Sequence, residues 1–280
     1  MNNSREILDD RSLNKVINKP SDLWLLGNHR LLCEDSTKIE NIENLMNNRK
    51  ADLVFTDPPY LLATRGGQSD EIGARLQRQG KALEFTANFE PQRFLDVLPF
   101  LFHKNMNAYI FCNKSLLPQY LNFAVEHGYS YNILIWKKPN PIPIKGSHWP
   151  DVEYLLLFRE NAIWNGGLEG VNYSRCLQFP RVRKSEEFGN HPTVKPIKLV
   201  MNEIKISSRE NGIVVDPFGG SGTTLIACEQ LNRKCYMMEI DPKYCDVIIR
   251  RWQKLTGQQA ILESNGKSFE EINSERNNHD

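Results

Sequence analysis

The sequence has no apolar run near the length of a membrane span, no closely paired cysteines and almost no net charge. A transmembrane helix needs about 20 consecutive apolar residues, and the polar, Asn-rich N-terminus has no apolar signal segment. We therefore expect a cytoplasmic protein without a membrane anchor. The six cysteines show no C-x-x-C spacing, which disfavours a zinc site or a disulfide framework and predicts reduced thiols in the core. No metal site is expected.

A net charge of only +1 excludes a uniformly basic protein. Any surface that binds nucleic acid must therefore be a local basic face, offset by acidic residues elsewhere. The length of 280 residues is enough to bury a substantial core.

Seven short apolar runs alternate with stretches of helical periodicity, and this alternation predicts an α/β fold with a seven-stranded, doubly wound, mostly parallel sheet. The predicted strands are residues 30–34, 51–56, 108–112, 131–137, 153–159, 212–215 and 234–239. The predicted helices are residues 36–47, 91–103, 115–127, 196–206, 221–231 and 241–255. We expect an N-terminal arm at 1–20, a single domain at 21–256 and a flexible C-terminal tail at 257–280.

Two motifs each close a predicted strand. The first is Asp57-Pro58-Pro59-Tyr60, and the second is the run D-P-F-G-G-S-G-T-T at residues 216–224. Because open α/β sheets bind ligands at the carboxyl ends of their parallel strands, we expect the two motifs to face one crevice.

The glycines of the second motif indicate a nucleotide cofactor. Gly219, Gly220 and Gly222 follow a strand and open a helix, so the backbone can turn tightly and approach a ligand closely. A triphosphate is disfavoured because no Gly-Lys-Ser/Thr follows, and a dinucleotide is disfavoured because Leu225 replaces the third glycine of that fingerprint.

Together the motifs resemble those of the S-adenosylmethionine-dependent DNA amino-methyltransferases, and their order, base-receiving motif before cofactor motif, resembles the β class of that family. The resemblance covers residues 25–252. It implies a Rossmann-like methyltransferase fold with loop insertions for DNA recognition, S-adenosylmethionine as cofactor, double-stranded DNA as partner in the nucleoid, and a homodimer. The catalytic half is then 21–160 and the cofactor half 191–256.

The resemblance also implies which residues bind the cofactor: Asp35, Thr193, Lys195, Asp216, Phe218, Gly219, Gly220, Ser221, Gly222, Thr223 and Glu239. Thr193 and Lys195 would face its carboxylate, Asp216 its methionine end and Asp35 its adenine. Glu239 ends the next strand, where related folds bind ribose hydroxyls. Plainer interpretations stay open: Lys195 also fits a solvated lysine at a helix start, Asp35 a helix cap, and Glu239 a cap of the turn into residues 241–242.

The first motif fits methylation of an exocyclic amine. The adenine amino nitrogen is a poor nucleophile because its lone pair is delocalised into the ring. Asp57 can accept a hydrogen bond from one N–H and the Pro58 carbonyl from the other, which localises the lone pair and stabilises the developing positive charge. Pro58 and Pro59 exclude helix here, and Tyr60 offers a ring on which a flipped base can stack. Alone, the motif also fits a strand-ending turn.

Three segments are candidates for DNA recognition: 61–90, 137–150 and 160–190. Their basic residues could contact phosphates or simply form a solvated face. These residues are Arg65, Arg75, Arg78, Lys81, Lys137, Lys145, Arg175, Arg181, Arg183 and Lys184.

Asp57 favours adenine N6 over cytosine N4 as the target, because the family tends to use Ser in place of the first Asp for the cytosine product. A protein-glutamine or RNA-base methyltransferase is disfavoured, because those usually carry Asn there and have the cofactor motif first. A DNA-binding homologue without activity is disfavoured because both motifs are intact.

Overall fold

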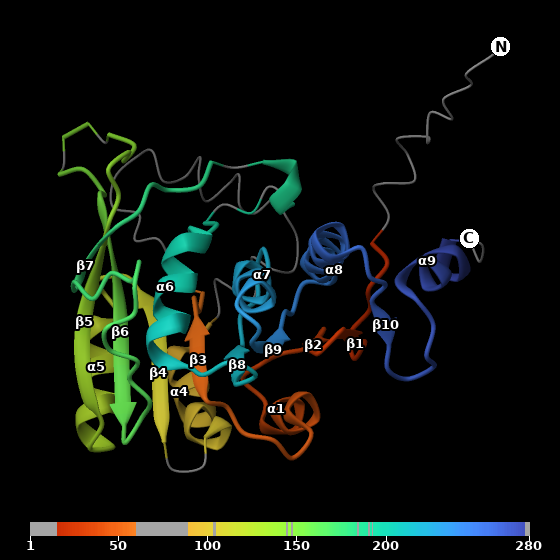
Figure 1. Cartoon of the computed structure of the whole chain (residues 1–280), viewed down its shortest axis with the longest axis horizontal. Coiled ribbons are helices and arrows are strands. Elements are labelled where there is room, and N and C mark those ends of the chain that lie inside the picture. The colour runs from red at the N-terminus through yellow and green to blue at the C-terminus, as the bar shows by residue number, and fades with distance from the viewer. Residues whose placement is uncertain are drawn as a thin grey trace.

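The computed structural model describes residues 16–59, 89–102, 105–143, 145–146, 148–183, 185–189, 191 and 193–277. In this part of the chain ten strands form one sheet, in the order β10-β1-β2-β9-β8-β3-β4-β6-β5-β7 (Figure 1). The strands are β1 (Leu23–Leu26), β2 (His29–Leu32), β3 (Leu53–Thr56), β4 (Met106–Cys112), β5 (Ser130–Lys137), β6 (Val152–Glu160), β7 (Cys176–Gln178), β8 (Ile213–Asp216), β9 (Lys234–Met238) and β10 (Ile261–Leu262).

The helices are α1 (Ile39–Met46), α4 (Pro91–Val97), α5 (Leu117–Glu126), α6 (Ile197–Ser207), α7 (Thr223–Gln230), α8 (Pro242–Thr256) and α9 (Phe269–Asn277), with short 3-10 helices η2 (Leu98–Leu101) and η3 (Glu186–Phe188). Six helices of the described chain coincide with predicted helical stretches, and α9 was not predicted. Proline stands in the first turn of α4, α5 and α8, where its fixed φ suits a helix start.

The centre of the sheet is parallel. β2, β9, β8, β3 and β4 pair in parallel, in that spatial order. β6 is antiparallel to both β4 and β5, so β5 runs in the same direction as β4, and β7 pairs in parallel with β5. The carboxyl ends of β3, β4, β5, β8 and β9 therefore share one edge of the sheet, together with the amino end of β6.

Helices cover both faces of the sheet, as Figure 1 shows. Alternate residues of each strand enter two separate cores: Leu53 and Phe55 of β3 join the core beneath α6, α7 and α8, whereas Val54 joins the core beneath α1, α4 and α5. This period of two explains why the central strands are apolar throughout. The predicted doubly wound, Rossmann-like fold is confirmed.

The strand count differs from the prediction, because ten strands replace seven. β1 pairs with β2 through a two-residue turn in which Gly27 has φ +58°, and such a turn beginning with glycine is a common hairpin connection. β7 and β10 are only three and two residues long, too short to show a period. All three are added at the two ends of the sheet.

The expected C-terminal tail is instead packed structure as far as Asn277. β10 pairs with β1, and the buried Phe269 of α9 contacts the Trp24 ring edge to face at 5.4 Å. Ser268 and Glu271 form a capping box at the start of α9, with backbone N–H bonds of 2.8 and 3.3 Å to each other's side chains. Burial of one Phe stabilises a fold by about 1.5 to 3 kcal/mol, so this segment belongs to the domain.

The expected N-terminal arm is also attached where the structure describes it. Ile17 is buried, and the backbone N–H groups of Ile17 and Asn18 donate to Asp246 of α8 at 2.9 and 3.0 Å. Residues 1–15 lie outside the described residues.

Candidate active site

The two motifs meet at the shared edge of the sheet. β3 and β8 are adjacent and parallel, so Asp57, directly after β3, lies beside Asp216 at the end of β8. The Thr56 hydroxyl donates to Asp216 Oδ1 at 2.8 Å, which joins the motifs directly. Both Thr56 and Asp216 are buried, and this burial raises the pKa of Asp216 to about 7.

Only one of the two carboxylate oxygens of Asp57 accepts a hydrogen bond from a described residue. Its Oδ2 accepts a hydrogen bond from the Lys195 ammonium, whereas Oδ1 is buried and has no hydrogen-bond partner among the described residues. Burial raises the pKa of Asp57; the Lys195 charge opposes this rise and the Glu153 carboxylate adds to it. A buried acceptor without a donor is costly, and it is the group that an amine donor would satisfy.

The glycine motif forms a tight loop from β8 into α7. The Gly219 N–H donates to the Met238 carbonyl at 2.7 Å, and a Cβ on Gly219 would lie 2.8 Å from the Met237 sulfur. Gly222 precedes α7 with φ +79°, a conformation that favours glycine. The backbone thus approaches β9 closely and aims the N-terminus of α7 at the edge.

Glu239 holds this loop. Its Oε2 accepts from the Gly220 N–H at 2.7 Å, and its Oε1 accepts from the Asp241 N–H at 2.9 Å. The plainer interpretation, a cap of the turn into α8, is therefore present in the structure, and the ribose role stays a prediction. Burial raises the pKa of Glu239 to about 7, although both backbone bonds oppose the rise.

The remaining predicted cofactor residues lie around this loop. Phe218 is half-buried, and its ring meets the Phe94 ring edge to face at 5.2 Å. The Ser221 and Thr223 hydroxyls are 3.1 Å apart. Asp35 follows β2 and accepts from the Thr37 N–H at 2.9 Å, which forms a local turn. It is not the helix cap of its plainer interpretation, because the N-cap of α1 is Lys38, and its cofactor role stays a prediction.

Lys195 is buried beside the base-receiving motif. Its ammonium is buried against Asp57 and Glu153, so it is neither a solvated lysine nor turned only toward a cofactor. The Thr193 N–H donates to His191 Nδ1 at 3.3 Å. Burial and the Lys195 charge lower the pKa of His191 to about 4, so this ring is neutral. The cofactor roles of Thr193 and Lys195 stay predictions.

Two of the predicted DNA-recognition segments contact each other. The Arg181 side chain donates from Nε to the Asn140 carbonyl at 2.9 Å, which joins 160–190 to 137–150. Lys137 ends β5 at the same edge as Asp57. Lys137, Lys145, Arg175 and Arg183 are exposed, and Arg181 is partly exposed. Tyr60, Arg65, Arg75, Arg78, Lys81 and Lys184 lie outside the described residues.

Sequence reasoning missed three residues of the site. Thr56 joins the motifs, and Glu153 and Lys138 extend the charges around Asp57, with Lys138 Nζ 2.5 Å from Glu153 Oε1. Glu153 could have been noticed as a carboxylate that opens an apolar run in β6.

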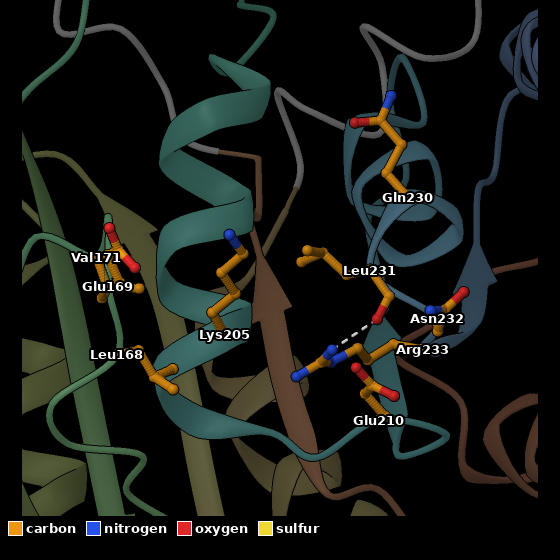
Figure 2. A pocket seen from close by; sticks show the side chains of 9 residues that line it. All are labelled: Leu168, Glu169, Val171, Lys205, Glu210, Gln230, Leu231, Asn232 and Arg233. Atoms are coloured by element: carbon orange, nitrogen blue, oxygen red, sulfur yellow. Dashed lines mark hydrogen bonds between the residues drawn. The ribbon is translucent and has the colours of Figure 1, made fainter.

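A cavity of about 320 Å³ lies at the opposite edge of the sheet, near the amino ends of β8 and β9 (Figure 2). Its Arg233 guanidinium donates to the Leu231 carbonyl at 2.6 Å and to the Ser208 carbonyl at 3.0 Å. Glu210 and Lys205 also line it. The arginine is bonded to the backbone and the other charges are mixed, so this cavity is not the active site.

Neither a metal centre nor a membrane span is found in the part of the chain that the structure describes. Within the described ranges, His, Cys, Asp and Glu residues form no group of three able to hold a metal ion. None of the helices described is long and apolar enough to span a membrane.

Comparison with known proteins identifies the family. Residues 51–250 match the N6_N4_Mtase family of DNA methylases. The chain is 26% identical to the Type II methyltransferase M2.LlaDCHI of Lactococcus lactis subsp. cremoris over 72% of this chain and 82% of that protein. It is 28% identical to the Type II methyltransferase M.HpaI of Haemophilus parainfluenzae over 79% of this chain and 73% of that protein.

Two solved structures superpose on most of this chain. The crystal structure of the M1.HpyAVI-SAM complex superposes with a TM-score of 0.60 at 25% identity, over 79% of this chain and 98% of that chain. The cytosine-N4-specific PvuII DNA methyltransferase superposes with a TM-score of 0.57 over 94% of each chain, and at 17% identity it shows the fold alone.

The residues at the edge fit S-adenosylmethionine and an amine acceptor. The loop from Gly219 to Gly222 brings a helix N-terminus to the edge, the half-buried Phe218 precedes this loop, and Asp57 Oδ1 is a buried acceptor without a described donor. The sheet, the joined motifs and the family match lead to one conclusion: the chain belongs to the N6/N4 DNA methylase family and is an S-adenosylmethionine-dependent DNA amino-methyltransferase.

Proposed function

We propose that this protein transfers a methyl group to the N6 amine of a flipped-out adenine in duplex DNA, at a specific sequence. The observation that carries the proposal is Asp57: a carboxylate at the base-receiving position whose Oδ1 is buried without a hydrogen-bond partner in the described part of the chain. The resemblance associates Asp here with adenine and Ser with cytosine.

S-adenosylmethionine supplies an electrophilic methyl group on a sulfonium. The residues proposed to hold it are the loop 218–223 and Glu239, with Asp216 and Asp35 at its two ends. Asp57 accepts an N–H of the target amine at Oδ1, which localises the nitrogen lone pair and stabilises the positive charge that develops there. Lys195 keeps the other oxygen of Asp57 occupied, so the carboxylate presents one defined acceptor.

The segments joined by Arg181 and Asn140 are proposed to contact the DNA backbone. Lys137, Arg175 and Arg183 are exposed on these segments, and Lys137 is at the active edge of the sheet. Positive charge beside the base-receiving motif would hold the phosphates that flank a flipped nucleotide.

Mass spectrometry of nucleosides from treated DNA tests the proposal. The expected product is N6-methyladenine, and methylation-sensitive sequencing of DNA from expressing cells gives the target sequence. N4-methylcytosine as the only modified base would overturn the adenine assignment. An absence of both bases across varied DNA would favour the inactive DNA-binding homologue.

The variant Asp57→Ala separates the base from the cofactor. We expect no methyl transfer but a cofactor affinity close to that of the wild type, since the described contacts of Asp57 are to Lys195 and not to the glycine loop. Glu210→Ala, an exposed carboxylate at the opposite edge, is the matched control and should keep both properties.

A further inference from the structure

Asp57 is the first member of a row of four alternating charges. Lys195 bonds Asp57 Oδ2 and lies 3.4 Å from Glu153 Oε2, and Glu153 Oε1 lies 2.5 Å from Lys138 Nζ. The side chains of Asp57, Lys195, Glu153 and Lys138 are only 20%, 7%, 20% and 14% exposed. We call these four residues the charge row.

The charge row is assembled from four separate segments. Asp57 follows β3, Lys195 precedes α6, Glu153 is the second residue of β6, and Lys138 follows β5. Residues at the amino end of β6 reach the active edge because β6 runs against its neighbours.

Aromatic rings fix both ammonium groups from a second side. Lys195 Nζ lies 4.6 Å from the centre of the Phe111 ring, and Lys138 Nζ lies 5.0 Å from that of Trp136. The two rings contact each other edge to face at 6.3 Å. A cation over a ring face is held without hydrogen bonds, so each lysine is confined between a ring and a carboxylate.

Folding does not require such a row. Removing four charges from water is costly, and well-packed apolar side chains of similar size often stabilise a protein equally or better. The sheet around the row is otherwise apolar: Phe111, Trp136 and Leu155 are buried in the core beneath α6. Because folding alone does not explain four charges in this apolar region, and because the row ends at the base-receiving carboxylate, we relate the row to the chemistry of Asp57.

We propose that Glu153, anchored by Lys138, is a positioning residue for methyl transfer, which confines Lys195 to one oxygen of Asp57 and so keeps Oδ1 free for the target amine. The proposal rests on the role of Asp57 given above, whichever amine it receives. Without Glu153, Lys195 loses one of the two carboxylates that the structure places beside its ammonium, and an ammonium beside one carboxylate can bridge both of its oxygens. Lys195 would then compete with the amine for Oδ1.

Glu153 and Lys195 also act with opposite sign on the ionisation of Asp57. The Glu153 carboxylate raises the pKa of Asp57 and the Lys195 ammonium lowers it. The titratable or charged groups that face Asp57 from the surrounding elements are Lys195, Glu153, Lys138, Cys112, Tyr120 and Asp216. Burial raises the pKa values of Cys112 and Tyr120, which keeps both neutral below pH 8. Asp216 titrates near pH 7 and contributes alike to all variants of the row.

The test is the single-turnover rate of methylation against pH for the full-length protein, with saturating DNA and cofactor. Glu153→Gln should lower the rate about 10- to 100-fold, the range for a misplaced reacting group, with cofactor affinity unchanged by calorimetry. Because the variant removes a negative charge, the pKa of Asp57 falls and the acid limb of the profile should move to lower pH. Lys195→Met should move the acid limb to higher pH, and Glu153→Asp should recover part of the rate.

Glu126→Gln, at the exposed end of α5 and outside the segments proposed to contact DNA, is the control and should behave as the wild type. Lys138→Met keeps the pair of Asp57 and Lys195 and should give a smaller reduction of the rate, which keeps the proposal testable if Glu153→Gln does not fold. A wild-type rate and acid limb in Glu153→Gln, or acid limbs that move in the same direction in the Glu153 and Lys195 variants, would overturn the proposal. The base that the wild type modifies is identified separately, so a cytosine product would contradict the proposed function without deciding the role of Glu153.

Discussion

Replacing Glu239 by alanine should weaken both the fold and the binding of the cofactor. In the structure this buried carboxylate accepts two backbone N–H groups, from Gly220 at 2.7 Å and from Asp241 at 2.9 Å. Alanine leaves both donors without their acceptor. The glycine loop and the start of α8 would lose the group that joins them.

The size of the effect on stability follows from these two bonds. A buried donor left unsatisfied costs about 1 to 3 kcal/mol, so the variant loses roughly 2 to 6 kcal/mol. One opposing contribution depends on pH. Because burial raises the pKa of Glu239 to about 7 from 4.5, full ionisation of the wild type costs about 3 kcal/mol, at about 1.4 kcal/mol for each pH unit. This cost is absent only below pH 4.5, grows as pH rises from 4.5 to 7 and is complete above pH 7, so the destabilisation by alanine should be larger at pH 6 than at pH 8.

The assay is urea unfolding at pH 6 together with calorimetric titration of the cofactor at pH 8, where Glu239 is ionised. With a slope near 2 kcal/mol per M, a loss of 2 kcal/mol lowers the midpoint by about 1 M. If Glu239 also accepts a ribose hydroxyl, removal of that charge-assisted bond, about 1.5 to 3 kcal/mol, weakens cofactor binding about 10- to 100-fold. The control Glu210→Ala should change neither quantity.

Two results would refute this reasoning in different ways. An unchanged urea midpoint would mean that the two backbone bonds do not contribute to stability. A lower midpoint with unchanged cofactor affinity would limit Glu239 to the structural role. Equal losses of cofactor affinity in Asp57→Ala and Glu239→Ala would contradict the division of the site into a base half and a cofactor half.

Three further predictions follow from the same site and its surroundings. Gly222→Ala should lower the melting temperature, because φ is +79° there and the new Cβ would lie 2.8 Å from a side chain of α8; an unchanged melting temperature would contradict this. Burial raises the folded-state pKa values of Asp216 and Glu239 to about 7, so the folded state binds more protons than the unfolded state between about pH 4 and 7. The stability that these two carboxyl groups contribute should therefore be lost as pH rises through 7. The urea midpoint should be lower at pH 8 than at pH 6, and equal midpoints would contradict this. Replacing Arg75 and Arg78, outside the described residues, by alanine should weaken DNA binding and reduce its salt dependence by about one unit of slope for each phosphate that is no longer neutralised, with cofactor affinity unchanged; a wild-type salt slope would exclude them as phosphate-binding residues.

The central fold and the place of the two motifs could be predicted from sequence because both depend on local patterns. The run at 212–215 is apolar and β-branched, and glycines follow it, so the end of β8 and the start of α7 are defined within a few residues. The direction of the strands then follows from the alternation with helices, which makes the sheet parallel at its centre. Asp57 and Asp216 lie at the carboxyl ends of two parallel strands, so the sequence predicted that they would share one edge of the sheet.

The ends of the chain were mispredicted for a different reason. The segment after residue 256 is polar on average, and its attachment depends on only a few apolar side chains, chiefly Phe269 and Ile272. A sparse pattern of this kind resembles a solvated tail until its partner, Trp24, is known. The capping box of Ser268 and Glu271 was the one local signal of a helix.

The charge row could not be predicted by the sequence rule that predicted Asp57, Asp216 and Glu239. That rule looks for functional residues after the carboxyl ends of parallel strands, and it finds Asp57, Asp216 and Glu239. The amino end of an antiparallel strand lies at the same edge of the sheet as the carboxyl ends of the parallel strands. Its first residues therefore lie beside the last residues of the parallel strands. β6 is such a strand, and Glu153 is its second residue. A carboxylate that opens an apolar run is therefore a candidate site residue once the direction of its strand is known, and that direction is decided by pairing with distant strands and not by the run itself.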